Sequence, residues 1–273
     1  MLVYLYKKIP KSLRNRIGKA KSLKWLRDFI LRKGGVYKER TVTIKRAYLD
    51  YNVDFKFVAS IKEASNALVK GIENTMLNNS ITLLRKRNVK ASEITVLDVG
   101  ANFGYLSLVW SQTICKEGKV IAFEPSKDVF SSLSKSIKAN NVSSIIDAVN
   151  VAVGNENKMV NLYLNDSTSN VIPENENQKS NAVQMIRLDD YIEQMSSACD
   201  LIKIDVDGIE HEILKGSIET LKKYQPIYIV ETNDDIKIVE FFEENDYAIL
   251  DEKLNTFKKG QLLPPNVYCV PKV

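Results

Sequence analysis

An acidic residue, a glycine turn and a second acidic residue follow one another around position 100, in an order that suits nucleoside binding. The segment VLDVGANFGY carries Asp98, Gly100 and Gly104 at the end of an apolar run. Glycines permit a tight turn and a close approach of the backbone to a ligand, and the helix expected next would offer free N–H groups. Glu124 lies twenty positions after Gly104, where a carboxylate can accept hydrogen bonds from ribose hydroxyls.

Together these residues favour a ligand that combines a nucleoside with a cationic and an anionic group. S-adenosylmethionine (SAM) meets this description, with its ribose at Glu124 and its amino-acid end at Asp98 and the Gly100–Gly104 turn, which includes Ala101 and Asn102. NAD fits less well, because the turn is G-x-x-x-G rather than G-x-G-x-x-G and its pyrophosphate would lie beside a carboxylate. A glycine turn that only packs a helix on a strand is the structural alternative.

A second pair of carboxylates follows the apolar run in DLIKIDVD, where Asp205 and Asp207 alternate and are expected to share one side of a strand end. One hypothesis is general base catalysis, because burial or a neighbouring charge can raise the pKa of a carboxyl group. Another is a divalent cation such as Mg²⁺, held by both aspartates with Glu231 or Asn233. In a third, Asp205 orients backbone or cofactor and Asp207 caps a helix starting at Ile209.

Two neighbouring side chains complete this candidate site. Lys203 is expected to point to the same side as Asp205, from deeper in the strand. His211 is the only histidine of the chain, but it falls off the apolar face of the helix expected after Ile209. We therefore expect His211 to be solvated or hydrogen-bonded rather than catalytic.

The elements that must position these residues are predicted from residue 93 onward. Short runs rich in Val, Ile and Leu alternate with helical patterns, which is typical of βαβ units around a parallel sheet covered by helices on both faces. The late runs YAILDE and NVYCV are expected to add an antiparallel edge. The polar segment Asn155–Asn181, interrupted by MVNLYL, is expected to be a loop over the sheet edge. The predicted strands lie in ITVLDVG, KVIAFEP, IIDAVNVAV, DLIKIDVD and PIYIVET.

Six motifs in order resemble the FkbM family of SAM-dependent methyltransferases: VLDVGANFGYLS, VIAFEPS, VNVAVGN, RLDDYI, DLIKIDVDGIEHEILKG and PIYIVE. The match runs from about Glu73 to Glu231, over more than half of the chain. It implies a class I, Rossmann-like methyltransferase fold and O-methylation of a hydroxyl, commonly on a sugar or polyketide. The family most often has Glu where Asp207 stands. The resemblance maps cofactor binding onto Asp98, Gly100, Asn102, Gly104 and Glu124.

The remaining site assignments complete the expected methyltransferase. Pro125 is expected beside the cofactor, and Ala152 and Val153 are expected to flank its adenine. Asp205 and Asp207 would orient or deprotonate the acceptor, and residues 155–185 would cover or select it. The acceptor is expected to be a glycan, a lipid-linked sugar or a related small molecule.

The charge of the chain is unevenly distributed. Residues 1–90 contain 22 Lys and Arg against 6 Asp and Glu, whereas residues 91–273 contain 17 against 28. The 273 residues, 44% hydrophobic and 27% charged, exclude a fibrous or wholly disordered chain. We expect residues 1–58 to form a basic N-terminal extension, with a helix and a hairpin or two short strands. Residues 59–273 would form the methyltransferase domain.

The basic segment 1–33 interleaves apolar residues at roughly helical spacing, so it suits peripheral contact with an anionic membrane or packing on the acidic body. Nucleic acid is a less favoured partner, because no RNA-binding module is recognisable. The start of the chain does not resemble a secretory signal, and three widely spaced cysteines favour a reducing compartment. We therefore expect a cytoplasmic protein, which could be peripheral to the membrane. The alternative functions are a nucleic-acid methyltransferase recruited by the basic segment and a non-enzymatic, membrane-associated adaptor.

Overall fold

A computed structural model of the protein describes residues 32–33, 36–87, 89–165, 168–170, 180–195 and 198–272. The helix expected within residues 1–33 lies outside the described residues. Of that segment, the structure describes only the short strand β1 (Arg32–Lys33), which pairs antiparallel with β2 (Val36–Tyr37). Within the described part of the chain, no helix is long and apolar enough to cross a membrane.

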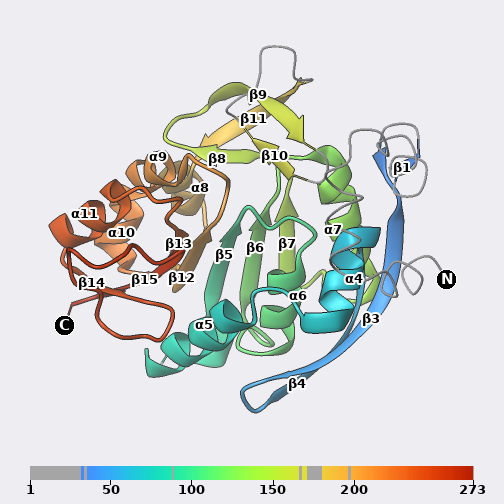
Figure 1. Ribbon diagram of the computed structural model, residues 1–273, viewed down its shortest axis with the longest axis horizontal. Coiled ribbons are helices and arrows are strands. Elements are labelled where there is room, and N and C mark those ends of the chain that lie inside the picture. The colour runs from blue at the N-terminus through green and yellow to red at the C-terminus, as the bar shows by residue number, and fades with distance from the viewer. Residues whose placement is uncertain are drawn as a thin grey trace.

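A seven-stranded, mostly parallel sheet forms the centre of the described structure (Figure 1). Its order is β14-β15-β13-β12-β5-β6-β7, in which only β15 runs antiparallel to its neighbours. This topology confirms the predicted α/β class and the antiparallel edge. The strands are β5 (Thr95–Val99), β6 (Lys119–Phe123), β7 (Ile146–Val149), β12 (Leu201–Ile204), β13 (Ile227–Glu231), β14 (Tyr247–Leu250) and β15 (Asn266–Pro271).

Helices cover both faces of this sheet, as the nearly continuous apolar strands require. One face packs against α5, α6, α7 and an N-terminal hairpin, and the other packs against α8, α9, α10 and α11. The 3-10 turn Ala91–Glu93 leads into β5. The helices are α4 (Ile61–Lys70), α5 (Asn74–Lys86), α6 (Tyr105–Gln112), α7 (Lys127–Ala139), α8 (Leu188–Glu193), α9 (Glu210–Lys215), α10 (Ile218–Tyr224) and α11 (Lys237–Glu244).

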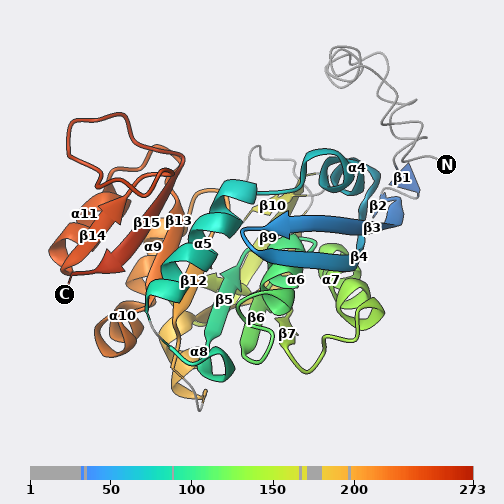
Figure 2. The same cartoon turned by 90° about the horizontal axis from the view of Figure 1, so that it is seen from below.

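The N-terminal hairpin consists of β3 (Glu39–Tyr48) and β4 (Tyr51–Ser60), in agreement with the hairpin expected there. Figure 2 shows it lying across the helices α6 and α7. Phe55 and Phe57 are fully buried in the core that contains these helices. The side chains of Ser136 and Asn140 bind the backbone of β4 at Val58 and Lys56. The hairpin is therefore fixed to the sheet by both apolar packing and hydrogen bonds.

A second, small sheet lies over the carboxyl ends of the central strands (Figure 1). Its order is β10-β9-β11-β8, with bounds Thr168–Asn170, Lys158–Asn165, Ser180–Arg187 and Ala152–Gly154. The expectation of a loop from Asn155 to Asn181 is therefore wrong for the parts that form β9, β10 and the start of β11, whereas residues 155–157 lie outside any strand. The pairing of β9 with β11 satisfies the backbone and buries Leu162 on one side, which explains the strand.

Candidate cofactor and acceptor pocket

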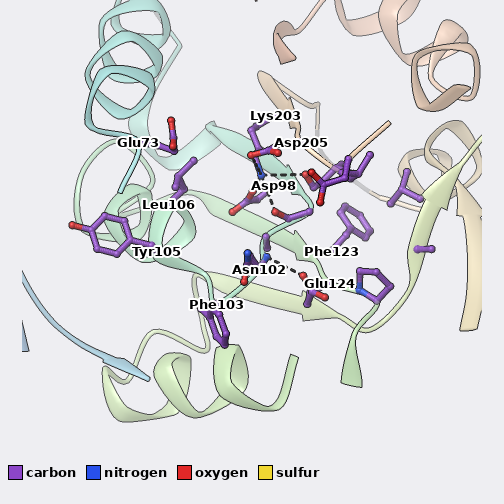
Figure 3. A pocket seen from close by; sticks show the side chains of 18 of the residues that line it. Glu73, Asp98, Asn102, Phe103, Tyr105, Leu106, Phe123, Glu124, Lys203 and Asp205 are labelled. Carbon is purple, nitrogen blue, oxygen red and sulfur yellow. Dashed lines mark hydrogen bonds and ion pairs between the residues drawn. The ribbon is translucent and has the colours of Figure 1, made fainter. Parts of the chain in front are cut away.

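A cavity of about 250 Å³ opens at the carboxyl ends of β5, β6 and β12 (Figure 3). This is the edge where an open α/β sheet binds ligands. Leu162 of β9 lines it from above, so the small sheet contributes to its wall. The cavity brings together the residues predicted for the site with one exception: Asp98, Gly100, Ala101, Asn102, Glu124, Pro125, Ala152, Val153, Asp205 and Asp207.

The exception is Gly104, which lies behind the turn and does not line the cavity. It is the N-cap of α6 and has a φ of 79°, in the left-handed region that favours glycine. A Cβ atom at this position would lie 2.2 Å from Cδ1 of Leu133 in α7. The visible role of Gly104 is therefore close packing of two helices, and its predicted contact with a cofactor stays a prediction.

The front of the turn is held tightly against the neighbouring strands. The N–H groups of Gly100 and Ala101 both donate to the carbonyl oxygen of Phe123, at 3.1 and 2.9 Å. Gly100 has a φ of 77°, and a Cβ atom there would lie 2.0 Å from the backbone oxygen of Asp205. Only glycine allows β12 to approach this closely, so the turn and the end of β12 form one wall.

Glu124 follows β6 and is only 6% exposed. Its two carboxylate oxygens accept hydrogen bonds from the backbone N–H groups of Asn102, at 3.0 Å, and Ser126, at 2.8 Å. Burial raises the pKa of Glu124 to about 7, although the two N–H donors act in the opposite direction. The carboxyl group is thus fixed in place while it lines the cavity, as a ribose-binding residue would have to be.

Lys203 is the buried centre of the site, with an exposed fraction of 3%. Its Nζ atom lies 3.3 Å from Oδ1 of Asp98 and 3.6 Å from Oδ2 of Asp205, and it donates to the carbonyl oxygen of Gly100 at 2.8 Å (Figure 3). Burial lowers the pKa of Lys203, but Asp205 and Asp98 outweigh this effect and raise it overall. The lysine therefore remains charged and joins β5, the glycine turn and β12. The contact with Asp205 confirms the expectation that Lys203 points to the same side as that residue.

Asp98 is almost fully buried and has a second partner, since Ser107 Oγ donates to its Oδ2 atom at 2.5 Å. Its Oδ1 atom has the ion-pair contact with Lys203 but no hydrogen bond within the described residues. That oxygen is fully buried, so its contact is the internal lysine, which the sequence did not predict as the partner of Asp98.

Beyond Asp205, the cavity wall leads to a group of carboxyl side chains. Glu231 ends β13, and strand pairing places it beside Asp205, which follows β12. Asn233 Nδ2 donates to Oε2 of Glu231 at 3.2 Å and to Oε1 of Glu210 at 2.9 Å. Burial raises the pKa of Glu231 to about 7, and the charge of Asp205 adds to this shift.

Glu73 lines the same end of the cavity and was missed by sequence reasoning. It precedes α5 with a φ of 46°, which is strained for a residue other than glycine. Burial raises the pKa of Glu73, and the charge of Asp205 contributes to the rise. No local motif marks this residue, because its position depends on the packing of α5 against β13.

Asp207 also lines the cavity but is exposed and has a φ of 62°. The strand β12 ends at Ile204, so the alternation expected through Asp207 stops before it. The N-cap of α9 is Ile209, and the carboxylate of Glu210 accepts from the backbone N–H of Gly208 at 3.0 Å. The alternative in which Asp207 is the helix cap is therefore wrong.

Two further expectations concern metal ligands and His211. Among the residues that the structure describes, no group of three or more His, Cys, Asp or Glu side chains is arranged to hold a metal ion. His211 does not line the cavity, and its ring lies 6.4 Å from that of Phe241 in an edge-on contact. The position of His211 agrees with a role outside catalysis.

Comparison with known families decides the identity of this fold and site. A model of the FkbM methyltransferase domain matches residues 98–249, more than half of the chain. The chain belongs to the FkbM methyltransferase family. The matched range starts at Asp98 and includes the glycine turn, Glu124, Lys203 and Glu231. The fold is that of class I SAM-dependent methyltransferases, as the sequence motifs implied.

Solved structures of other methyltransferases are similar to this chain at low identity. The FkbM methyltransferase of Methylobacillus flagellatus KT is 15% identical, with 77% of this chain and 54% of that protein covered and a TM-score of 0.45. This chain thus spans about half the length of that protein. A putative rRNA methylase of Clostridium thermocellum is 11% identical over 72% of this chain and 95% of its own, with a TM-score of 0.45.

The N-terminal domain of human METTL16, in complex with SAH, is 14% identical over 73% of this chain and 70% of its own, with a TM-score of 0.41. No curated protein matches this chain.

Proposed function

We propose that this FkbM-family protein transfers the methyl group of SAM to a hydroxyl of a glycan, a lipid-linked sugar or a related small molecule. The observation that carries the proposal is the charge of the cavity. Among its described lining residues, Lys203 is the only cation, and it already contacts Asp98 and Asp205. The acidic lining residues are Glu63, Glu73, Asp98, Glu124, Asp205 and Asp207.

This charge favours a neutral, hydroxyl-rich acceptor. Carboxylates accept hydrogen bonds from several hydroxyl groups at once, as a sugar would offer them. A phosphate group entering the same cavity would meet like charges without a free cation to pair with. The cavity therefore supports a glycan acceptor over a nucleic-acid strand.

The cofactor would occupy the end of the cavity formed by β5 and β6. Glu124 would accept hydrogen bonds from the ribose, and Asp98 with the Gly100–Asn102 turn would hold the methionyl group. Ala152 and Val153 would flank the adenine, with Pro125 beside it. When bound, SAM supplies an electrophilic methyl group on a sulfonium centre.

The acceptor would occupy the end formed by β12, where Asp205 and Asp207 line the cavity. Asp205 would orient the acceptor hydroxyl and take its proton, because it combines cavity access with a fixed position beside Lys203. The main contribution of the protein is to hold this hydroxyl in line with the methyl group. Asp207 would help to orient the acceptor from the more exposed rim.

The test compares Asp205→Asn with wild type, using labelled SAM and a glycan and lipid extract from cells that lack the protein. We expect turnover to fall by about 100-fold or more, while SAM affinity changes by less than about threefold. Asp147→Asn, at an exposed position of β7, is the matched control. Equal rates for the variant and wild type would contradict the assignment, and label found in nucleic acid would contradict the acceptor class.

A nucleic-acid methyltransferase and a non-enzymatic adaptor are the competing functions. The excess of Lys and Arg in residues 1–90 favours an anionic partner for the N-terminal segment. We propose that this partner is an anionic membrane surface contacted through residues 1–33, which would bring a cytoplasmic enzyme to lipid-linked sugars. Co-flotation of the protein with phosphatidylglycerol vesicles tests this membrane contact.

Two other measurements test the competing functions. Filter binding of RNA or DNA by the protein, with an affinity that falls steeply as salt rises, would favour the nucleic-acid function. Titration calorimetry that detects no binding of SAM would favour the adaptor.

A further inference from the structure

Glu231 and Asp205 are brought together by the register of two parallel strands. Ile204 of β12 pairs with Val230 of β13, so the residues that follow them lie side by side. Residues at paired positions of adjacent parallel strands carry their side chains on the same face, so the two carboxyl groups are neighbours. Two neighbouring carboxyl groups can hydrogen-bond to each other only when one of them holds a proton, since ionised carboxylates are acceptors alone.

The surroundings assign this proton to Glu231. The ammonium of Lys203 lies 3.6 Å from Asp205 Oδ2, so Asp205 already has a cationic partner. Burial and the charge of Asp205 raise the pKa of Glu231 to about 7, while the Asn233 amide partly offsets the rise. The other charged groups facing the pair are Glu210 of α9 and Glu73 before α5, with Glu252 acting on Glu73.

The pair also sits where a cation would change its charge. Asp205 lines the cavity, whereas Glu231 does not and is reached through Asp205. A positive charge in the cavity would favour loss of the shared proton, because it stabilises two ionised carboxylates over one. A neutral ligand of the same shape would leave the proton in place.

We propose that Glu231 is a positioning residue that shares one proton with Asp205, that this proton leaves when the cationic methyl donor binds, and that the acceptor hydroxyl replaces it. This inference rests on the proposed function. In the transfer, the acceptor oxygen bonds to the methyl carbon as the C–S bond breaks and its electron pair stays on sulfur. The hydroxyl proton passes to Asp205 and is shared with Glu231, so each turnover restores the protonated pair.

The proposal predicts a difference between SAM and its demethylated product SAH, which carries no sulfonium charge. Titration calorimetry of the full chain at pH 7, in two buffers of different ionisation enthalpy, measures the protons released on binding. We expect SAM to release up to about half a proton more than SAH, because a group with a pKa of about 7 is half protonated at this pH. Glu124 also has a raised pKa and lines the same cavity, so the Glu231→Gln variant, in which Glu124 is unchanged, isolates the share of Glu231.

Glu231→Gln separates a shared proton from a merely structural contact. The glutamine amide can donate to Asp205 as protonated Glu231 does, but it cannot titrate. We expect SAH affinity within about threefold of wild type, together with a smaller SAM–SAH difference in proton release. In turnover assays, the ionisation near pH 7 should also disappear from the pH profile.

Glu73→Gln is the matched control, because Glu73 faces the same aspartate with a raised pKa. The difference in proton release should persist in this variant. Equal release by SAM and SAH in the wild type, or a difference that survives unchanged in Glu231→Gln, would overturn the inference and leave the proposed function standing. Failure of both ligands to bind would overturn the proposed function and this inference with it.

Discussion

The two ends of the cavity hold their carboxyl groups by different means. At the β5–β6 end, Glu124 accepts hydrogen bonds from two backbone N–H groups, which fix its position whatever the ligand. At the β12–β13 end, strand pairing places Glu231 beside Asp205, and the Asn233 amide donates to Glu231. Backbone donors preorganise a binding group, whereas paired carboxyl groups depend on a proton that can leave. The first end suits recognition, and the second suits proton transfer.

The same two ends are joined at two points. Gly100 touches the backbone of Asp205 so closely that a Cβ atom would not fit, and Lys203 contacts Asp98 and Asp205 with one ammonium group. A change at either point should therefore affect both ends, whereas a change elsewhere should affect one end or neither. The following variants test this separation.

The largest effect is expected for Lys203→Met, which removes the shared cation and leaves Asp98 buried without it. Loss of one partner of a buried ion pair typically costs about 3–5 kcal/mol. We expect the free energy of unfolding, measured by urea denaturation, to fall by this amount. Binding of both SAM and SAH should weaken as well.

Lys135→Met is the control for this variant, because its ion pair with Glu39 is largely at the surface. Such pairs contribute less than about 1 kcal/mol. Equal destabilisation by the two substitutions would show that Lys203 does not join the two ends energetically.

A smaller effect, confined to the cofactor end, is expected for Glu124→Ala. Loss of a charged acceptor of ribose hydrogen bonds should weaken SAM and SAH alike by about 100-fold, or about 2.7 kcal/mol. The SAM–SAH difference in proton release should remain, since Glu231 is untouched. Glu117→Ala, at an exposed position, provides the control in calorimetry. Unchanged affinity would refute the ribose assignment.

The contrast between the ends also explains what the sequence could predict. Asp98, Gly100 and Glu124 lie in contiguous strand–turn motifs, so local pattern alone was enough to bring them to one predicted site. The central sheet followed in the same way from its alternating apolar runs. Glu73 could not be predicted, because its place in the cavity results from the packing of α5 on β13.

Three other differences between the expectations from sequence and the structure arise from geometry that no residue pattern encodes. The partner of Asp98 is the internal Lys203, which only the pairing of β12 with β5 places there. The positive φ of Asp207 ends the alternation that had been extended through it. The strands β9 and β11 form through pairing between segments separated by residues 171–179, so their alternation alone did not distinguish a small sheet from a loop.

The smallest effect is expected for Gly104→Ala, which tests whether this glycine serves packing or the cofactor. An alanine at a φ of 79° costs about 1–2 kcal/mol, and Leu133 can move its side chain to relieve the contact. We expect that loss of unfolding free energy, with SAM affinity unchanged within about threefold. In Gly100→Ala the obstacle is instead the backbone oxygen of Asp205, which cannot move without shifting β12, so SAM binding should be lost. If Gly104→Ala also abolished SAM binding while the fold persisted, Gly104 would belong to the cofactor end after all.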